Sequence, residues 1–357
     1  MFWVHVDRVQ FPAPRLFMKK VVTIGGGTGS FMLLSGLRKY PIELSAIVSM
    51  ADDGGSTGVL RDELGVLPPG DVRQCLVALS ESSDILRDLM NYRFANGGLS
   101  GHSFGNLFLS ALEKITGSFS EGVLEASKIL NVKGEVIPVT ATDTSLKVKL
   151  ADGTVLSGEH EINTSKLIGK IGIKRAFLAP QAKANKKAIE KILSADLIVI
   201  GPGNHYCSIL PNLLVEGIPE AILKSKAKVV YNCNLSNKRG HTDGFSLDDY
   251  VDEINGFLGG DRIDFVTFNT KKASEALVKR YKQKDGGLVT FEEEDRARRG
   301  YRVIRADLLS RIKTKHDPSD KISAERSFIR HDGERLAKVL IMLLELGEYE
   351  SILRDIV

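Results

Sequence analysis

The sequence lacks several features that mark whole classes of protein. Its three cysteines, Cys75, Cys207 and Cys233, match no metal-binding spacing and cannot all pair in disulfides, so we expect a reducing compartment, the cytoplasm. No apolar run is long enough to cross a bilayer. The net charge is +4, with a pI near 8.8, but there is no dense block of lysine and arginine. This balance argues against a nucleic-acid partner and suits an anionic small ligand.

The rest of the composition is that of an ordinary globular protein. Of 357 residues, 43% are hydrophobic and 26% are charged, which is enough for one large or two modest domains. Residues 1–17 have neither the apolar core nor the cleavage site of a signal peptide. Met18 directly precedes the first apolar run. We therefore expect residues 1–17 to be a disordered extension and residues 18–357 to form a single α/β domain.

A glycine-rich stretch, Lys19–Ser30, organises the first part of the chain. The apolar residues Val21–Ile24 predict a buried parallel strand that ends in glycines, and a helix is expected to start near Ser30. Glycines at such a junction let backbone N–H groups approach a ligand, and a helix N-terminus favours negative charge. The stretch predicts a phosphate-binding turn made of Gly26, Gly27, Thr28, Gly29 and Ser30.

A second junction, SMADDGGSTG from Ser49, adds carboxylates to the same pattern. The run Ile42–Met50 predicts a second strand, and Asp52 and Asp53 follow it. Two carboxylates beside a phosphate-ready turn are typical of a site where magnesium bridges an anionic ligand. Both aspartates are therefore candidate metal ligands. The phosphate-binding candidates at this junction are Gly54, Gly55 and Ser56.

Neither junction completes a standard nucleotide-binding fingerprint. The last glycine of a dinucleotide-binding G-x-G-x-x-G would fall on Ser30, and the Lys-Ser/Thr ending of a Walker loop is absent. The acid pair lies roughly where a ribose-binding acid ends the second strand of a dinucleotide-binding fold. Tight turns with solvated acids are the structural alternative, which the two junctions together disfavour.

Two further stretches supply candidate ligand contacts. The apolar strand predicted at Leu197–Ile200 ends in Gly-Pro-Gly-Asn, and small polar residues with a histidine open an apolar helix predicted over Leu107–Ile115. For the second stretch, a capped helix with a core histidine is the structural alternative, but an asparagine in a first turn is costly without a partner. The candidates are Gly201, Gly203, Asn204, His102, Ser103 and Asn106.

Several later residues leave alternatives open. Asp71 is placed to cap a helix, with ligand contact as the slightly less favoured reading, and Asp332 is expected to cap the last helix. Arg330 is equally a phosphate contact or a structural residue. Tyr281 lies in a basic cluster that by default is a solvated face. Asn234 ends a predicted strand and belongs to a polar patch.

The stretch 136–178 changes character. Alternating residues over Leu146–Leu150, a turn at Asp152-Gly153 and the run Thr154–Leu156 predict a β-hairpin. We interpret it as a small antiparallel excursion from the main domain that serves as a lid or a dimer contact. Ile171–Leu178 is expected to return to the main sheet.

These motifs together resemble those of the bacterial gluconeogenesis factor family, which is related to the 2-phospho-L-lactate transferases of deazaflavin-cofactor biosynthesis. The resemblance covers nearly everything from Met18 onward. It implies a Rossmann-like α/β fold, a mostly parallel sheet with helices on both faces and a small β-hairpin or helical insertion. The matching segments include GGGTGS from Gly25, ADDGGSTG from Ala51, LPPGDVRQ from Leu67, LSGHSFGNLFLSAL from Leu99, ADLIVIGPGNHYCSILPNLL from Ala195, NCNLSNKRGHTDG from Asn232 and RHD from Arg330.

The resemblance implies a regulator or, as the alternative, an enzyme. Gluconeogenesis factors look like UDP-sugar-binding regulators of cell shape and envelope-precursor supply during growth on gluconeogenic carbon. Such a protein would bind UDP-N-acetylglucosamine or a similar nucleotide-sugar without turnover and regulate an enzyme of amino-sugar synthesis. The related transferases imply a homodimer. Asn204, Asn234, Tyr281 and Arg330 would contact base or sugar.

The transferase relatives imply different roles for the acid pair. In them, magnesium held by aspartates assists transfer of a phospholactyl group from a guanine-nucleotide-activated donor. On that analogy Asp52 and Asp53 would be catalytic. A nicotinamide-dependent dehydrogenase is a third reading, disfavoured by Ser30 and by the glycines that follow the acid pair.

Overall fold

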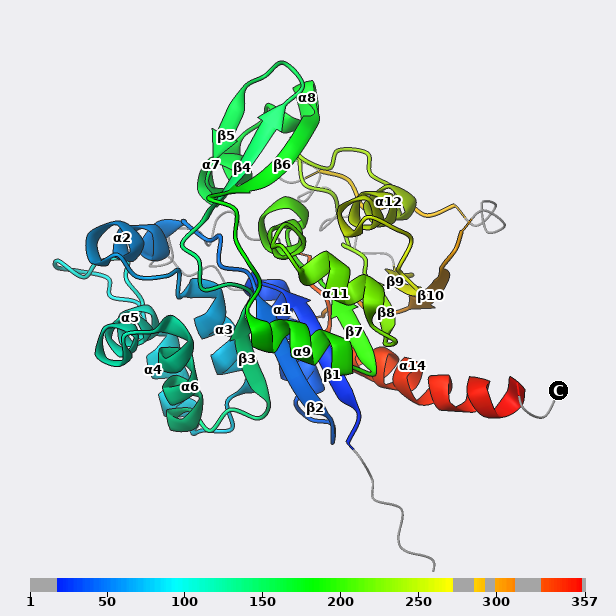
Figure 1. The fold of residues 1–357 in the computed structure, drawn as a ribbon, viewed down its shortest axis with the longest axis horizontal. Coiled ribbons are helices and arrows are strands. Elements are labelled where there is room, and N and C mark those ends of the chain that lie inside the picture. Colours follow the sequence, from blue (N-terminus) through cyan, green and yellow to red (C-terminus); the bar gives the residue numbers. More distant parts are fainter. Residues whose placement is uncertain (1–17, 272–285, 293–298, 312–328, 355–357) are drawn as a thin grey trace, which may run out of the picture.

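The computed structural model of the chain describes residues 18–271, 286–292, 299–311 and 329–354. The extension expected at residues 1–17 and the candidate Tyr281 lie outside these residues. The centre of the fold is a seven-stranded sheet with the order β10-β9-β8-β7-β1-β2-β3 (Figure 1). Its strands, all parallel, are β1 (Lys20–Gly25), β2 (Glu43–Val48), β3 (Glu135–Pro138), β7 (Leu197–Ile200), β8 (Lys228–Asn232), β9 (Phe265–Asn269) and β10 (Arg302–Ala306).

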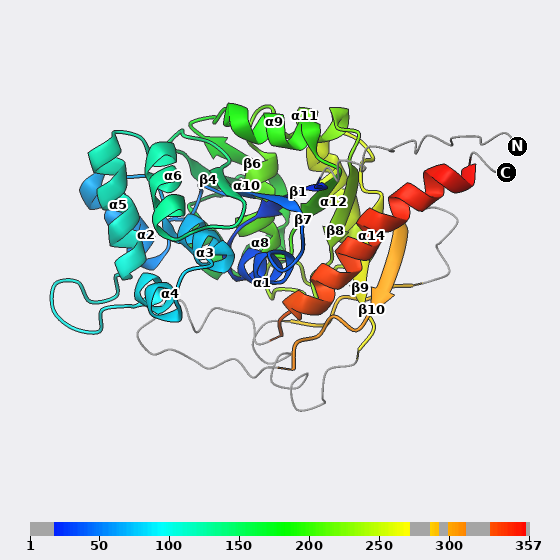
Figure 2. The ribbon, with the colours of Figure 1, turned by 90° about the horizontal axis from the view of Figure 1, so that it is seen from below.

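Helices cover both faces of this sheet. All four residues of β7 are buried, as expected for an apolar strand in a parallel sheet that is covered on both sides. Figure 2 shows α9 (Lys186–Ser194) and α11 (Ile218–Lys224) on one side, and α1 (Gly27–Leu37) and α14 (Gly333–Arg354) on the other. The predicted Rossmann-like α/β fold is confirmed.

The remaining helices extend these layers. The segment between β2 and β3 forms a helical group beside that edge of the sheet (Figure 1), and later helices follow β7 and β8 in the chain. The first group is α2 (Gly55–Leu64), α3 (Gly70–Leu79), α4 (Asp84–Asn91), α5 (Phe104–Thr116) and α6 (Phe119–Ile129), and the second is a π-helical turn η1 (His205–Ile209), α10 (Leu210–Leu213) and α12 (Leu247–Leu258). Within the residues described, no helix combines the length and the apolar character needed to cross a membrane.

The strand order reverses between β1 and β7. The chain runs outward from β1 to β2 and β3, then returns to β7 and runs outward the other way to β10. In open α/β sheets, such a reversal leaves a crevice at the carboxyl ends of the strands, and ligands bind there. One glycine-rich turn follows β1 and another follows β7. The topology therefore places these two turns side by side at this crevice.

A small antiparallel sheet, ordered β5-β4-β6, stands apart from the main sheet (Figure 1). The expected hairpin is confirmed, because β4 (Ser145–Leu150) pairs with β5 (Val155–Ser157). The prediction that Ile171–Leu178 returns to the main sheet was wrong, because β6 (Ile173–Ala179) pairs with β4 instead. Its alternating, half-exposed residues suit a sheet with one solvated face, whereas a central parallel strand is buried on both. The excursion also carries α7 (Glu159–Thr164) and α8 (Ile168–Ile171), while β3, in the first part of the stretch 136–178, is the edge strand of the main sheet.

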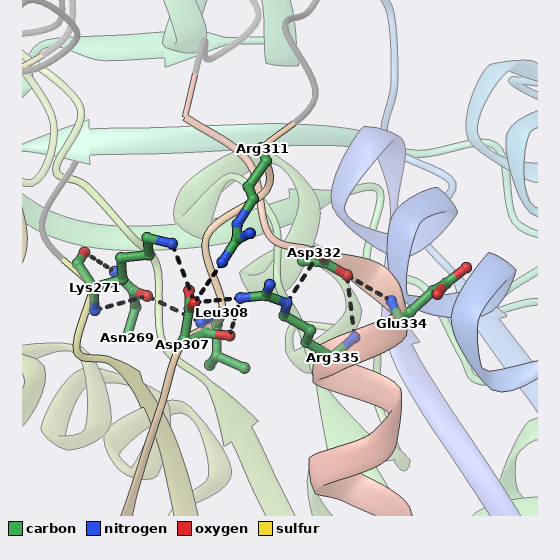
Figure 3. Close-up of polar contacts among 8 residues, drawn as sticks. All are labelled: Asn269, Lys271, Asp307, Leu308, Arg311, Asp332, Glu334 and Arg335. Carbon is green, nitrogen blue, oxygen red and sulfur yellow. Dashed lines mark hydrogen bonds and ion pairs between the residues drawn. The ribbon is translucent and has the colours of Figure 1, made fainter. Parts of the chain in front are cut away.

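Polar contacts fix the start of α14 (Figure 3). The Asp332 Oδ1 atom accepts hydrogen bonds from the backbone N–H groups of Glu334 and Arg335, at 3.1 Å each, so the expected cap is confirmed. The Asp307 carboxylate, just after β10, forms ion pairs with Arg335 and, at 3.3 Å, with Lys271. These contacts hold the segment 329–331, which precedes α14, next to the carboxyl ends of the strands.

Candidate functional site

A cavity of about 290 Å³ lies at the reversal point of the sheet. Its walls come from the turns after β1, β2 and β7, from the loop after β8, from α7 of the small sheet, and from residues 329–331 before α14. Segments far apart in the sequence therefore meet here. This is the crevice at which the topology predicts ligand binding.

The turn after β1 brings backbone to the cavity wall. Gly26 is extended and Gly27 has φ +64°, in the left-handed region that favours glycine. A Cβ atom on Gly26 would lie under 3.0 Å from the Asp71 carboxylate, and one on Gly29 equally close to the Pro202 carbonyl. The helix begins at Gly27, not near Ser30 as expected, because two glycines complete the turn. Its first turn, not the loop, thus contains Thr28, Gly29 and Ser30.

Asp71 is not a helix cap. The residue at the cap position of α3 is Pro69, and Asp71 lies within the first helical turn and is largely buried. Its carboxylate packs against Gly26. The prediction of a cap was wrong because the turn Pro68-Pro69-Gly70 starts the helix one residue before Asp71. The side chain thereby supports the glycine turn after β1.

Side-chain amides hold the turn after β7. Asn232, fully buried at the end of β8, donates from Nδ2 to the Gly201 carbonyl at 3.0 Å. Asn204 caps η1, its Oδ1 accepting from the Cys207 N–H at 3.4 Å. Asn204 also donates from Nδ2 to Asn163 Oδ1 of α7 at 2.8 Å. This turn is therefore fixed from the main sheet and from the small sheet.

Carboxylates concentrate at one side of the cavity. Burial raises the pKa of Asp52, although its Oδ1 accepts a 2.9 Å hydrogen bond from the Gly54 N–H. Burial, followed by the charges of Asp52, Asp71 and Asp53, raises the pKa of Glu159 well above its usual range. Buried like charges without enough compensating positive charge disfavour ionisation. A bound cation would relieve this repulsion.

Asp53 faces α7 instead of the cavity. Its Oδ1 accepts the backbone N–H of His160 at 2.8 Å, and Oδ2 packs so closely on Gly158 that a Cβ atom there would overlap it. Within the described ranges, no three His, Cys, Asp or Glu side chains are arranged to hold a metal ion. Magnesium is commonly bound by one or two carboxylates together with ligand phosphates. Asp52 and Glu159, which line the cavity, fit that kind of shared site.

The residues around His102 form a hydrogen-bond network behind the turn that follows β2. Ser103 caps α5 and is fully buried. His102 Nδ1 lies 2.9 Å from Ser56 Oγ, and Asn106 Oδ1 accepts from Arg73 Nε at 2.9 Å. Asn106, in the first turn of α5, thus has a hydrogen-bond partner within the protein, Arg73. None of these side chains lines the cavity, so within the described structure they support the first turn of α2.

The comparisons with known proteins agree with this architecture. Residues 21–309 match the family model described as 2-phospho-L-lactate transferase CofD. A protein named gluconeogenesis factor from Bacillus subtilis (strain 168) is 40% identical over 91% of this chain and 98% of its own length. Another from Halalkalibacterium halodurans is 46% identical over 77% of this chain and 85% of its own. The chain belongs to the CofD family.

A solved relative supports the family assignment. A crystal structure of a UPF0052 family member from Bacillus halodurans is similar with a TM-score of 0.80 at 39% identity, covering 91% of this chain and 99% of that one. The resemblance inferred from the motifs is confirmed: this CofD-family chain is related to the gluconeogenesis factors.

The CofD-family cavity includes about half of the predicted site residues. Those that line it are Gly26, Thr28, Gly29, Asp52, Gly54, Gly203, Asn204, Asn234 and Arg330. Those that lie behind its wall are Gly27, Ser30, Asp53, Gly55, Ser56, His102, Ser103, Asn106 and Gly201. Tyr281 lies outside the described residues. The structure therefore divides the predicted site residues into those that line the cavity and those that lie behind its wall.

Other lining residues were missed in the sequence. Glu159 and Asn163 belong to the small sheet's helix, and Lys238 to the loop after β8. Lys238 stands in the motif NCNLSNKRGHTDG, from which only Asn234 was chosen as a site residue. The motif was thus a signal for Lys238. No local signal marks Glu159, because a short acidic helix is usually a solvated one.

Proposed function

We propose that this protein binds a nucleotide-sugar such as UDP-N-acetylglucosamine and acts as a regulator, a gluconeogenesis factor that controls cell shape and envelope-precursor supply during gluconeogenic growth. Its regulated partner would be an enzyme of amino-sugar synthesis. The names of the relatives support the gluconeogenesis factor assignment. The observation that carries the ligand class is the pairing of two glycine turns, after β1 and β7, at one cavity.

The physical reason for a phosphate-bearing ligand is backbone access. Gly26, Gly29 and Gly203 line the cavity, and the N-terminus of the eleven-residue helix α1 follows directly. Backbone N–H groups and the helix dipole favour an anion at such a terminus. Asn204 and Asn234 supply amides that can recognise a base or sugar by hydrogen bonds.

The alternative is a magnesium-dependent transferase of the 2-phospho-L-lactate type, and the acidic wall favours it. Asp52 and Glu159 would hold the ion together with the ligand phosphates. When bound, magnesium would neutralise phosphate charge and polarise the phosphoryl group. The protein's own residues would orient the donor along the glycine turns.

Calorimetric titration distinguishes the nucleotide-sugar-binding regulator from the transferase. The protein is titrated with UDP-N-acetylglucosamine and with GDP, each with and without magnesium, and phosphorus NMR follows each ligand afterwards. Binding of the uridine ligand without consumption supports the regulator. A magnesium-dependent preference for GDP that Asp52→Asn removes would support the transferase. Binding of neither would overturn both.

A further inference from the structure

Positive charge is scarce on the cavity wall. The wall includes Asp52 and Glu159, with Asp71 directly behind Gly26. Among the described residues that line it, the lysine and arginine side chains are Lys238 and Arg330. An anionic ligand entering an acidic cavity needs such charges, because like charges repel strongly where water is excluded.

Lys238 lies beside the acidic wall. Its ammonium group donates a hydrogen bond to Asn163 Oδ1 on α7. Its charge also acts on Glu159, one helical turn before Asn163, where it opposes the rise in the pKa of that carboxyl. Lys238 therefore lies where α7 meets the glycine turn after β7, since Asn163 Oδ1 also accepts from Asn204 at 2.8 Å.

The backbone of Lys238 is held in place by its own loop and by α12. Its N–H donates to Thr242 Oγ1 at 2.9 Å, and that hydroxyl accepts from the buried Tyr250 hydroxyl at 2.8 Å. The same Tyr250 hydroxyl lies 2.9 Å from Asn237 Oδ1. The loop is thus anchored to α12 before Lys238 extends into the cavity, so a ligand pays little ordering entropy for its backbone.

The small sheet is itself attached at other points. Asp53 accepts the His160 N–H, and the Gly169 N–H donates to the Gly240 carbonyl at 2.5 Å. Asn163 is therefore presented by α7, which the Asp53–His160 bond fixes against the turn after β2, and α8, which contains Gly169, attaches the same insertion to the loop after β8. The Asn163 oxygen can hold the Lys238 ammonium at a defined place.

We propose that Lys238 binds a phosphate oxygen of the nucleotide-sugar and that Asn163, on the inserted helix α7, is the positioning residue for its ammonium group. The inserted sheet then contributes to ligand affinity through one side chain that need not touch the ligand. This inference rests on the proposed function and adds to it the residue that neutralises the phosphate.

The test is calorimetric titration of the full chain with UDP-N-acetylglucosamine. Lys238→Met should weaken binding about ten- to hundredfold, the loss expected for one hydrogen bond to a charged group. Asn163→Leu, which keeps the charge but removes the acceptor, should weaken it by a smaller factor. Lys238→Arg should retain part of the affinity. Lys174→Met, at an exposed position of β6, is the matched control and should bind as the wild type does.

A double variant separates positioning from a structural effect. If Asn163 acts through Lys238, the variant with both substitutions should bind no more weakly than Lys238→Met alone, because coupled residues are not additive. Thermal unfolding of each variant checks that it is folded. Unchanged affinity in Lys238→Met, or fully additive losses in the double variant, would overturn the inference. Absence of UDP-N-acetylglucosamine binding in the wild type would instead overturn the proposed ligand, and the same variants titrated with GDP would then decide the role of Lys238.

Discussion

Acidification should destabilise the protein through a buried histidine beside the cavity. His331 is 7% exposed, and burial lowers its pKa from 6.5 to about 4, although a backbone contact with Cys233 opposes the shift. Its Nε2 atom has no hydrogen-bond partner among the described residues. In the unfolded chain the imidazole takes up a proton near pH 6.5, whereas in the folded protein it stays neutral until about pH 4.

The sign and size of the effect follow from linkage. The histidine's contribution is fully present above pH 6.5 and is lost as the pH falls through 4, because the unfolded state binds the proton first. The difference between the two pKa values, at 1.36 kcal/mol for each pH unit, corresponds to a total loss of roughly 3 kcal/mol. About 1.4 kcal/mol of this should be lost by pH 5.5.

Denaturant unfolding of the wild type and His331→Phe at pH 7.5, 6.5, 5.5 and 4.5 measures this loss. The phenylalanine cannot titrate, so the free energy of unfolding should fall less steeply with acid in the variant. His241, whose pKa burial also lowers to about 4, contributes to the slope that remains in the variant. Leu309→Ala, at the buried bridge partner of His331, should lower stability at every pH and keep an acid-dependent slope, because the titrating imidazole is still present. Equal slopes in the wild type and His331→Phe would refute the reasoning.

Three further substitutions test the support of the cavity. Gly29→Ala would press a Cβ atom onto the Pro202 carbonyl and should cost about 1–3 kcal/mol of unfolding free energy as overpacking does, whereas Gly98→Ala, with nothing within 4 Å, should cost little; equal costs would contradict the predicted clash. Asp53→Ala removes the acceptor of the His160 N–H and should speed hydrogen exchange across residues 158–164; unchanged exchange would show that α7 is held otherwise. Asp332→Ala should lower stability by about 1 kcal/mol through loss of the α14 cap, and Asp332→Asn should restore most of it in the same denaturant assay.

The strands of the core could be predicted because their signals are local. β1 and β7 are short apolar runs that end in glycine, and both strands lie in the buried centre of the sheet. β6 could not be assigned in the same way. Its alternating residues fit either an edge of the main sheet or a separate small sheet, and only the pairing with β4 decides between them.

The glycine turns of the site could be predicted for a topological reason. Parallel strands end at one edge of a sheet, so Gly26, Asp52 and Gly203 had to lie near one another once their strands were identified. Asp71 shows where this reasoning stops. An acidic residue near the start of a helix predicts a cap. The Asp71 carboxylate instead packs against the glycine turn after β1, and no local pattern reveals that contact.

The insertion that carries the small sheet and α7 contacts the rest of the protein through residues far apart in the sequence. Its contacts with the cavity join residues 107 positions apart in the Asp53–His160 bond, 41 apart in the Asn163–Asn204 bond and 75 apart in the Asn163–Lys238 bond. The strand pairings of the main sheet do not involve α7, whereas the wall of the cavity does. It follows that substitutions in α7 should impair ligand binding more than they impair the core, and that the insertion, which the sequence marks only as a hairpin, is part of the site itself.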